Sequence, residues 1–194
     1  MEGKDFMKKI LFKGVGSAVP TPFTNDGVNL KEFEKFLQFQ IDNDIDALIV
    51  CGTTGESATM TKEEKIDVIK CAVEIAHKNK TSTRKIPIIA GTGSNNTKEA
   101  IEMSKIAEFL GVDGVLVVTP YYNKTTQKGL IAHYKTIAEN INTPIVLYNV
   151  PSRTGMNIEP ETCLELSKID NIVAIKEASR EHFASCRNCS FVRG

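Results

Sequence analysis

Several reactive side chains in this sequence stand inside short apolar runs or directly after them. Lys176 lies within one such run, IVAIKEA at residues 172–178. Burial disfavours the charged ammonium form of a lysine, and the neutral amine that results is a nucleophile toward a carbonyl carbon. The alternative is a lysine at a strand end whose ammonium group reaches solvent or pairs with Glu177. The position of the lysine alone leaves both interpretations open.

Three tyrosines follow other apolar runs. Tyr148 stands in LYNVPSRTG, and Tyr121 and Tyr122 stand in TPYYN. When an amine condenses with a carbonyl, protons move during formation and dehydration of the carbinolamine, and a phenol can carry them. The hydroxyls of Thr53 and Thr54, in GTTGES, could extend such a relay. Rings packed at strand ends would explain the tyrosines equally well without any chemistry.

Two further residues could recognise a carboxylate. Gly52 precedes the threonines and would let backbone N–H groups approach an anion closely. Arg153, which we expect on a loop between Pro151 and Gly155, carries a planar guanidinium group that matches a carboxylate. Taken singly, GTTGE is also an ordinary tight turn, and Arg153 an ordinary surface arginine.

The apolar runs and the segments between them predict the elements that position these residues. Continuous hydrophobicity predicts six strands buried on both faces, at 14–20, 47–52, 86–91, 114–120, 144–150 and 172–178. Apolar residues at spacings of three and four predict helices at 30–43, 61–78, 97–110, 126–140 and 160–168. Thr61 and Glu64 form a capping box at the start of one helix, and Gly111 is placed to end another.

Strands that alternate with helices favour βαβ units and the α/β class. A doubly wound sheet would carry a glycine-rich turn after its first strand, where this sequence has AVPTPF. A (β/α)8 barrel, or TIM barrel, gathers polar residues at the carboxyl ends of its strands, which is where Thr53, Tyr148 and Lys176 stand. The units repeat about every 32 residues, so eight of them need roughly 250 residues. We therefore predict about six βα units of a barrel over 1–179, with 180–194 (REHFASCRNCSFVRG) outside the pattern and non-native or disordered.

Composition excludes several classes of protein. The 24 Lys and Arg balance the 24 Asp and Glu, which argues against a partner that is a nucleic acid or an anionic membrane. No apolar run approaches the about 20 residues of a membrane span, and Lys13 interrupts any apolar stretch of a secretion signal. Five scattered cysteines predict reduced thiols and a cytoplasmic location. His77 and His133 fall in helical segments and His182 in the tail, and CRNC at 186–189 is isolated, so we expect no metal site.

Five ordered motifs, GTTGESATM, AGTGSNNTKEAI, VTPYYNKTTQKGL, LYNVPSRTG and IKEAS, resemble the dihydrodipicolinate synthase family. These are pyruvate lyases of the class I aldolase type on a (β/α)8 barrel, and the resemblance spans residues 10–179. It implies that Lys176 forms a Schiff base with pyruvate and that Tyr148 is the general acid and base above it. Thr53 would relay protons between Tyr148 and Tyr122, the latter reaching in from a neighbouring subunit of a tight dimer.

The resemblance also implies the substrates and the assembly. Thr54, with Gly52 beside it, would bind the pyruvate carboxylate, and Arg153 the carboxylate of L-aspartate 4-semialdehyde. The product would be 4-hydroxy-tetrahydrodipicolinate, on the route to diaminopimelate and lysine, made by a homotetramer with no cofactor beyond the Schiff base on Lys176. The last two barrel strands and the C-terminal helical domain of the family are missing here. A truncated, inactive fragment with two exposed sheet edges, or a related aldolase with another acceptor, is therefore an alternative.

In members of the family that lysine inhibits, a cleft at the dimer interface binds the effector. The corresponding positions here are Ser57, Ala58, Lys62, Lys65, Asn95, Glu99 and Tyr121. Histidine is expected at one or both of the positions that Lys62 and Lys65 occupy. Two ammonium groups would repel a cationic effector, so we predict weak or absent feedback inhibition by lysine.

Overall fold

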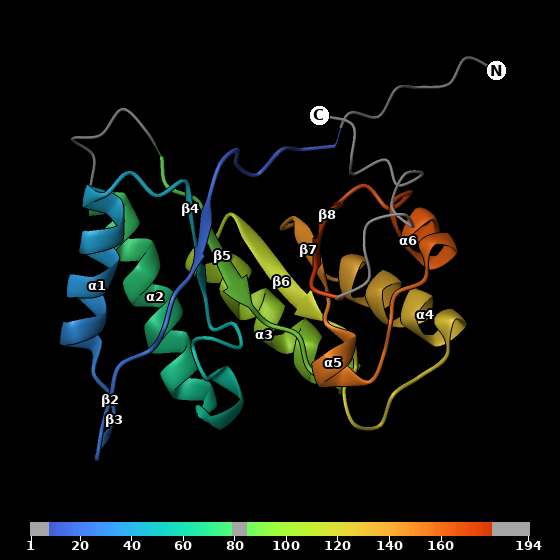
Figure 1. The fold of residues 1–194 in the computed structure, drawn as a ribbon, viewed down its shortest axis with the longest axis horizontal. Helices are drawn as coiled ribbons and strands as arrows, with labels where there is room; N and C mark the ends of the chain where they lie inside the picture. Colours follow the sequence, from blue (N-terminus) through green and yellow to red (C-terminus); the bar gives the residue numbers. More distant parts are fainter. Residues whose placement is uncertain (1–7, 79–84, 180–194) are drawn as a thin grey trace.

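The computed structural model of this chain describes residues 8–78 and 85–179. Its centre is a parallel sheet of six strands: β1 (Gly16–Ala18), β4 (Ala47–Val50), β5 (Ile88–Gly91), β6 (Gly114–Val118), β7 (Ile145–Asn149) and β8 (Ile172–Glu177). Their order in the sheet is their order in the sequence, so each strand joins the same growing edge. The sheet curls like part of a barrel wall (Figure 1). The six predicted strands and the incomplete (β/α)8 class are confirmed.

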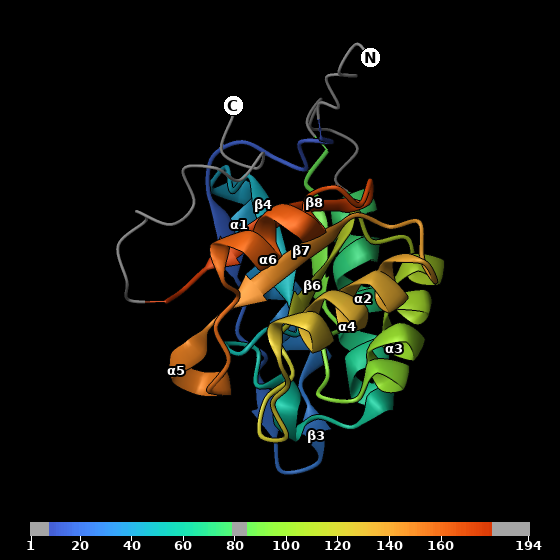
Figure 2. The same cartoon turned by 90° about the vertical axis from the view of Figure 1, so that its right-hand side faces the viewer.

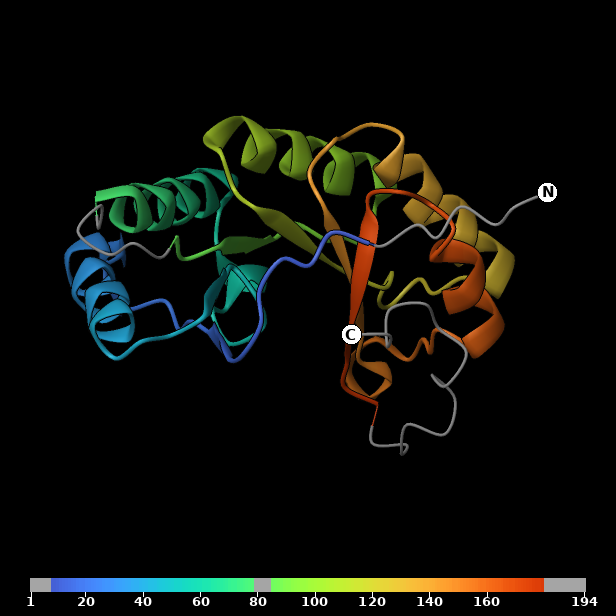
Figure 3. The same ribbon diagram turned by 90° about the horizontal axis from the view of Figure 1, so that it is seen from above.

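Five long helices follow the strands and lie in an arc on the outer side of the sheet (Figure 3). They are α1 (Leu30–Asp42), α2 (Lys62–Lys78), α3 (Thr97–Leu110), α4 (Gln127–Ala138) and α6 (Pro160–Leu166). Each overlaps a predicted helix. Figure 2 shows α6 beside α4, which it packs against at the β8 end of the sheet.

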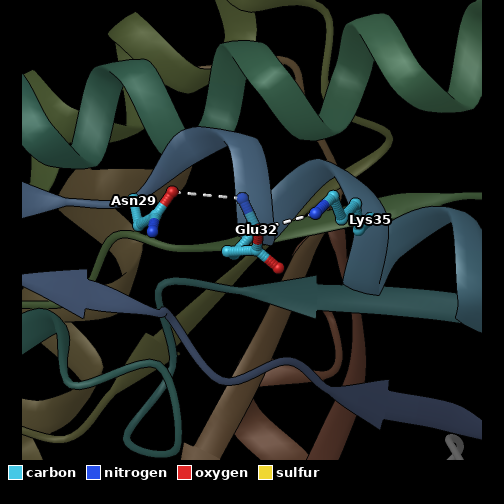
Figure 4. Close-up of polar contacts among 3 residues, drawn as sticks. All are labelled: Asn29, Glu32 and Lys35. Carbon is cyan, nitrogen blue, oxygen red and sulfur yellow. Dashed lines mark hydrogen bonds and ion pairs between the residues drawn. The ribbon is translucent and has the colours of Figure 1, made fainter.

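Local sequence explains where these helices begin and end. The Asn29 side chain caps α1 by accepting a hydrogen bond from the Glu32 N–H at 3.2 Å, and Lys35 pairs with the Glu32 carboxylate one turn later (Figure 4). The predicted capping box is present, because Thr61 and Glu64 bond reciprocally at 2.8 and 3.1 Å. The residue that ends α3 is the predicted Gly111, which adopts a left-handed φ of 87°.

The two faces of the sheet bury different sets of apolar side chains. Outward side chains such as Leu48, Ile88 and Leu147 pack against the helices and form the main core. Inward side chains form a smaller cluster on the concave face, made of Ile89, Leu116, Val146, Tyr148 and Val150. Strands buried on both faces need continuous apolar runs, which is why periodicity located them.

The segment before β1 runs along the amino ends of the strands. Leu11 and Phe12 pack against the concave cluster, and the Lys8 ammonium group donates to the Ile169 carbonyl at 2.6 Å, just before β8. The segment therefore spans from one edge of the sheet to the other (Figure 3). In the part of the chain that the structure describes, β1 and β8 each have a strand on one side only.

Three short elements were not predicted. A hairpin, β2 (Phe23–Thr24) with β3 (Gly27–Val28), lies between β1 and α1. A single 3-10 turn, η1 (Ser57–Thr59), precedes α2, and a four-residue helix, α5 (Pro151–Thr154), follows β7. The predicted tail at 180–194, with His182 and the CRNC motif, lies outside the described residues.

Candidate active site

Tyr148 and Lys176 lie opposite each other on adjacent strands. The two residues are partners in the register of β7 and β8, and the Lys176 Nζ is 4.4 Å from the centroid of the Tyr148 ring. Tyr148 is buried, whereas Lys176 is half-buried. A cation over the face of an aromatic ring is electrostatically favourable, so the pair holds the lysine above the phenol. The structure thus brings together the predicted nucleophile and its predicted proton carrier.

An irregularity in β8 places Lys176 on the concave face. Ile145 pairs with Ile172, but the next pair is Val146 with Ala174, so Val173 is an extra residue on β8. Ile172 and Ile175 consequently both face the helices, and Ala174 faces the concave cluster. Without the extra residue, strict alternation from Ile172 would point Lys176 toward the helices.

The interpretation of Lys176 as a partner of Glu177 is wrong. The Glu177 carboxylate accepts hydrogen bonds from Asn149 Nδ2 at 3.1 and 2.9 Å and from the Ser179 N–H at 2.6 Å. Within the described residues, no ion pair joins Glu177 to Lys176. Successive strand residues point to opposite faces, so the carboxylate and the ammonium group lie on opposite sides of the sheet.

The predicted turn after β4 lies beside this pair. It begins at Cys51, whose φ of 53° is left-handed, and it closes with a hydrogen bond of 3.1 Å from the Gly55 N–H to the Gly52 carbonyl. Thr53 and Thr54 are exposed on it. In the described chain, the Thr53 hydroxyl makes no hydrogen bond with either predicted phenol. The proton relay through Thr53 therefore stays a prediction.

Cys51 also contributes a thiol next to the turn. The thiol is buried, and burial raises its pKa to about 12. It therefore stays protonated and unreactive at neutral pH. Sequence reasoning did not single out Cys51 as a lining residue, because a lone cysteine beside glycines has no distinctive signature.

Glycine is required at Gly91, not at Gly52. A Cβ on Gly91 would stand 2.1 Å from the Cys51 carbonyl oxygen, so β5 approaches the turn too closely for any side chain. A Cβ on Gly52 would meet only Ile49 Cγ2 at 3.9 Å, an ordinary contact. The folding of the turn thus does not explain Gly52, and its role toward a substrate carboxylate stays a prediction.

The tandem tyrosines differ in their placement, because Tyr121 lines the same cleft as Tyr148 and Tyr122 does not. Tyr122 is 91% exposed and has a left-handed φ of 67°, a conformation that costs a non-glycine residue free energy. The Tyr121 carbonyl accepts from Asn95 Nδ2 at 3.2 Å, and Asn123 Nδ2 donates to the Asn95 carbonyl at 3.1 Å. These bonds hold the turn at Asn95 against the tyrosine turn. Tyr122 is not brought to Tyr148 within this chain.

Arg153 lies on helix α5, so the expectation of a loop there was wrong. Pro151 at the first helical position pre-sets φ, and Gly155 ends the helix with a φ of 68°. Thr154 adds hydrogen bonds from its hydroxyl to the Val150 and Met156 carbonyls at 3.2 and 3.0 Å. The Arg153 side chain is exposed at the carboxyl end of β7.

A cleft of about 170 Å³ opens beside the site. Predicted catalytic and effector residues line it together: Gly52, Thr53 and Tyr148 from the first group, and Ser57, Lys65, Glu99 and Tyr121 from the second. The remaining predicted residues do not line it, namely Thr54, Ala58, Lys62, Asn95, Tyr122, Arg153 and Lys176. The cleft therefore runs from Tyr148 toward the predicted effector positions.

The effector positions differ in their partners. Lys62 forms an ion pair with Glu102, and that hydrogen bond and charge lower the pKa of the Glu102 carboxyl. Glu99 accepts hydrogen bonds from Ser94 Oγ at 2.9 Å and from Asn96 Nδ2 at 3.2 Å. Of the two lysines expected to repel a lysine effector, only Lys65 lines the cleft.

The described residues contain neither a group of side chains placed to bind a metal nor a helix suited to cross a membrane. No group of three or more His, Cys, Asp or Glu in residues 8–78 and 85–179 is placed to hold a metal ion. Among the helices in those same ranges, none combines the length and the apolar character needed to cross a membrane.

Comparison with known proteins places these motifs in a family. The family model described as "Dihydrodipicolinate synthetase family" matches residues 11–189. The chain belongs to the dihydrodipicolinate synthetase family. The match ends at residue 189, inside the segment that we expected to lie outside the pattern.

Relatives within the dihydrodipicolinate synthetase family cover most of this chain. The 4-hydroxy-tetrahydrodipicolinate synthase of Clostridium novyi (strain NT) is 59% identical over 169 residues, which are 87% of this chain and 55% of the relative. The enzyme of the same name from Acetivibrio thermocellus is 56% identical over 173 residues, 89% of this chain and 57% of the relative. The chain thus spans about half the length of the curated relatives that it matches.

Solved structures of dihydrodipicolinate synthases share the fold. The Thermotoga maritima structure has a TM-score of 0.83 and 45% identity, and the match covers 89% of this chain and 57% of that one. The Acinetobacter baumannii structure, described as chloride-inhibited and complexed with pyruvate, has a TM-score of 0.81 and 47% identity over 86% and 55% of the two chains. The Cyanidioschyzon merolae structure, described as having lysine bound, has a TM-score of 0.83 and 42% identity over 89% and 58%.

Proposed function

We propose that this chain carries the Schiff-base site of an enzyme that condenses pyruvate with L-aspartate 4-semialdehyde to give 4-hydroxy-tetrahydrodipicolinate. The observation that carries the proposal is the pairing of Tyr148 with Lys176 on the concave face of the sheet. An amine 4.4 Å from the centre of a phenol ring has a proton donor and acceptor beside it. Relatives that carry the name of this synthase support the same reaction.

The chemistry assigned to the pair is proton-coupled imine formation. The neutral Lys176 amine attacks the C2 carbonyl of pyruvate, a C–N bond forms, and water leaves from the carbinolamine. Tyr148 donates the proton that the departing hydroxyl requires and takes a proton back when the imine becomes an enamine. The nucleophilic carbon of the enamine then attacks the aldehyde carbon of the semialdehyde, and the aldehyde oxygen takes up a proton to become a hydroxyl. The amino group of the semialdehyde attacks the imine carbon, closes the ring and releases the Lys176 amine. The Acinetobacter baumannii structure complexed with pyruvate supports the choice of the first substrate.

Carboxylate recognition is assigned to residues at the carboxyl ends of β4 and β7, of which Gly52 lines the cleft and Thr54 and Arg153 do not. Thr54 and Gly52 on the turn after β4 are assigned to the pyruvate carboxylate. Arg153, at the carboxyl end of β7, is assigned to the carboxylate of the semialdehyde. The guanidinium group is exposed in the absence of a substrate, and it can make two parallel hydrogen bonds to a carboxylate.

The proposal includes a homo-oligomer, a tight dimer within a tetramer, in the cytoplasm. An exposed phenol held at an unfavourable φ supports a role for Tyr122 outside its own subunit, because no hydrogen bond or ring contact within residues 8–78 and 85–179 involves the phenol. Thr53 would then link Tyr122 of one subunit to Tyr148 of another. Cys51, Cys71 and Cys163 are buried as thiols, which supports a reducing compartment.

The test is a two-substrate assay of the purified chain. Pyruvate consumption is measured with and without L-aspartate 4-semialdehyde, with Lys176→Arg as the inactive control. Semialdehyde-dependent consumption by the unaltered chain supports the proposal. Consumption that requires a different aldehyde would favour a related pyruvate aldolase. No consumption from a folded chain would favour the truncated fragment whose sheet edges at β1 and β8 are open.

A further inference from the structure

On the side of the sheet opposite Lys176, one polar pair joins β7 to β8. Asn149 is buried, and its Nδ2 donates to both Glu177 carboxylate oxygens, at 3.1 and 2.9 Å, and to Asn157 Oδ1 at 2.8 Å. Its Oδ1 accepts from the Ile158 N–H at 3.0 Å, and its main-chain carbonyl accepts from the Ala178 N–H at 2.8 Å. The Nδ2 group and the Oδ1 atom of the amide therefore both have hydrogen-bond partners at the carboxyl ends of the two strands.

Among the described residues, this pair is the side-chain hydrogen bond that joins the two strands, in addition to their main-chain ladder. The neighbouring outward pairs, Ile145 with Ile172 and Leu147 with Ile175, are apolar, and apolar contacts tolerate sliding because they have no preferred direction. Hydrogen bonds are lost when the partners move by one residue. The extra residue Val173 shows that β8 accommodates two registers along its length.

We propose that Asn149 and Glu177 are positioning residues that fix the register beyond Val173 and so hold Lys176 opposite Tyr148. A slip by one residue would bring Ile175 or Glu177 opposite Tyr148 and turn the lysine toward the apolar core under the helices. This inference rests on the proposed function, since it assigns the pair to the placement of the Schiff-base lysine. Neither side chain touches the substrate in this account.

The variants exchange the two chemical groups of the pair. Asn149→Asp sets two carboxylates against each other, and the combined Asn149→Asp, Glu177→Gln exchange restores an amide facing a carboxylate. The matched control is Thr162→Val, which removes a part-buried hydrogen bond of 2.7 Å to Gln127 Oε1 between α6 and α4 and leaves both Asn149 and Glu177 unaltered. Unfolding in urea is recorded for each variant, so that stability and positioning are separated.

The main measurement is the rate at which pyruvate is trapped on the chain by borohydride, as a function of pyruvate concentration. Misplacement of a reacting group by one ångström costs up to a hundredfold, so we expect Asn149→Asp to lower the limiting rate at least about tenfold. The pyruvate concentration that gives half of the limiting rate should change far less. The exchanged pair should recover most of the limiting rate, and Thr162→Val should trap pyruvate at the rate of the unaltered chain. The proposal would be overturned if Asn149→Asp trapped pyruvate at the normal rate. It would also be overturned if the exchanged pair were as stable as the unaltered chain but did not recover the trapping rate.

Two provisions keep the test decisive. If Asn149→Asp does not fold, Asn149→Ala takes its place. We again expect a lower limiting rate of trapping, and an unchanged rate would contradict the positioning role of the pair. If the unaltered chain traps no pyruvate, the proposed function fails by itself. Reductive methylation of Lys176 by formaldehyde, followed by peptide mass spectrometry, then still tests the positioning. The labelling rate should change in Asn149→Asp and return in the exchanged pair, and equal rates in all three proteins would refute it.

Discussion

Lys176 Nζ stands 4.4 Å from the centre of the Tyr148 ring, and the two residues are partners in neighbouring parallel strands. The lysine therefore lies over a phenol ring on the concave face. A phenol can donate a proton to a bound carbonyl and take one back. Separate substitutions can therefore test the amine of Lys176 and the phenol of Tyr148.

Replacement of Tyr148 by phenylalanine removes the proton carrier and keeps the ring. General acid and base catalysis contributes roughly 100-fold to 10,000-fold, so we expect imine formation with pyruvate to slow by at least about 100-fold. The free energy of unfolding should change by less than about 1 kcal/mol, because the ring still fills the concave cluster. Stopped borohydride trapping and urea unfolding measure the two quantities. A trapping rate equal to that of the unaltered chain would remove Tyr148 from the mechanism.

The contrast between two glycines tests how the turn after β4 is built. Gly91→Ala would place a Cβ 2.1 Å from the Cys51 carbonyl oxygen, so we expect a loss of about 3 kcal/mol or insoluble protein. Gly52→Ala meets its nearest atom at 3.9 Å and should cost less than about 1 kcal/mol. If both variants unfold alike in urea, the close approach of β5 to the turn is not as described.

The buried His133 makes the fold sensitive to acid. Its Nδ1 lies 2.9 Å from Thr97 Oγ1, its Nε2 is buried without a partner, and burial lowers its pKa to about 4. Between the unfolded pKa near 6.5 and the folded pKa, the unfolded chain binds the proton and the folded chain does not. Stability therefore falls as pH drops through that window, by at most about 3 kcal/mol.

The comparison that isolates this histidine uses His133→Gln. Urea unfolding at pH 7 and at pH 4.5 should show a smaller acid-induced loss of stability for the variant than for the unaltered chain. The carboxylates and the other histidines titrate equally in both proteins, so their contributions cancel when the two acid-induced losses of stability are compared. Identical losses in the two proteins would show that His133 is protonated in the folded state.

Lysine should bind this chain weakly or not at all. Lys62 is paired with Glu102, so the repulsion of a cationic effector rests on Lys65, which lines the cleft. The Tm of the unaltered chain should be the same with and without millimolar lysine. Added lysine should raise the Tm of Lys65→His, because a neutral imidazole removes the like charge. Lys62→His is the matched control and should have the smaller effect. A clear rise in Tm for the unaltered chain would contradict the prediction.

The strands and helices were predictable because both faces of the sheet are buried. Residues 114–118 are apolar throughout, and helix limits followed from Thr61 and Gly111. The hairpin at residues 23–28 was missed because two-residue strands are too short for periodicity. Helix α5 was missed for the same reason, although Pro151 and Gly155 are in fact its start and stop signals.

The site was predictable in its residues more than in its geometry. Polar residues after apolar runs pointed to the carboxyl ends of the strands, where Tyr148 and Lys176 indeed meet. The extra residue Val173 could not be predicted from the sequence, because residues 172–175 are all apolar and show no alternation of polar and apolar side chains. Glu177 was considered only as a partner of Lys176, since the Asn149 contact depends on which face each side chain occupies.

The most direct test of the account is the mass of the chain after incubation with pyruvate and borohydride, followed by peptide mapping. We expect one added group per chain, equal in mass to pyruvic acid less one oxygen atom, located on Lys176. Lys176→Arg should acquire none, because a guanidinium group does not form the imine. A folded chain that stays unmodified, or one that carries the adduct on another lysine, would contradict the assignment of Lys176 as the Schiff-base residue.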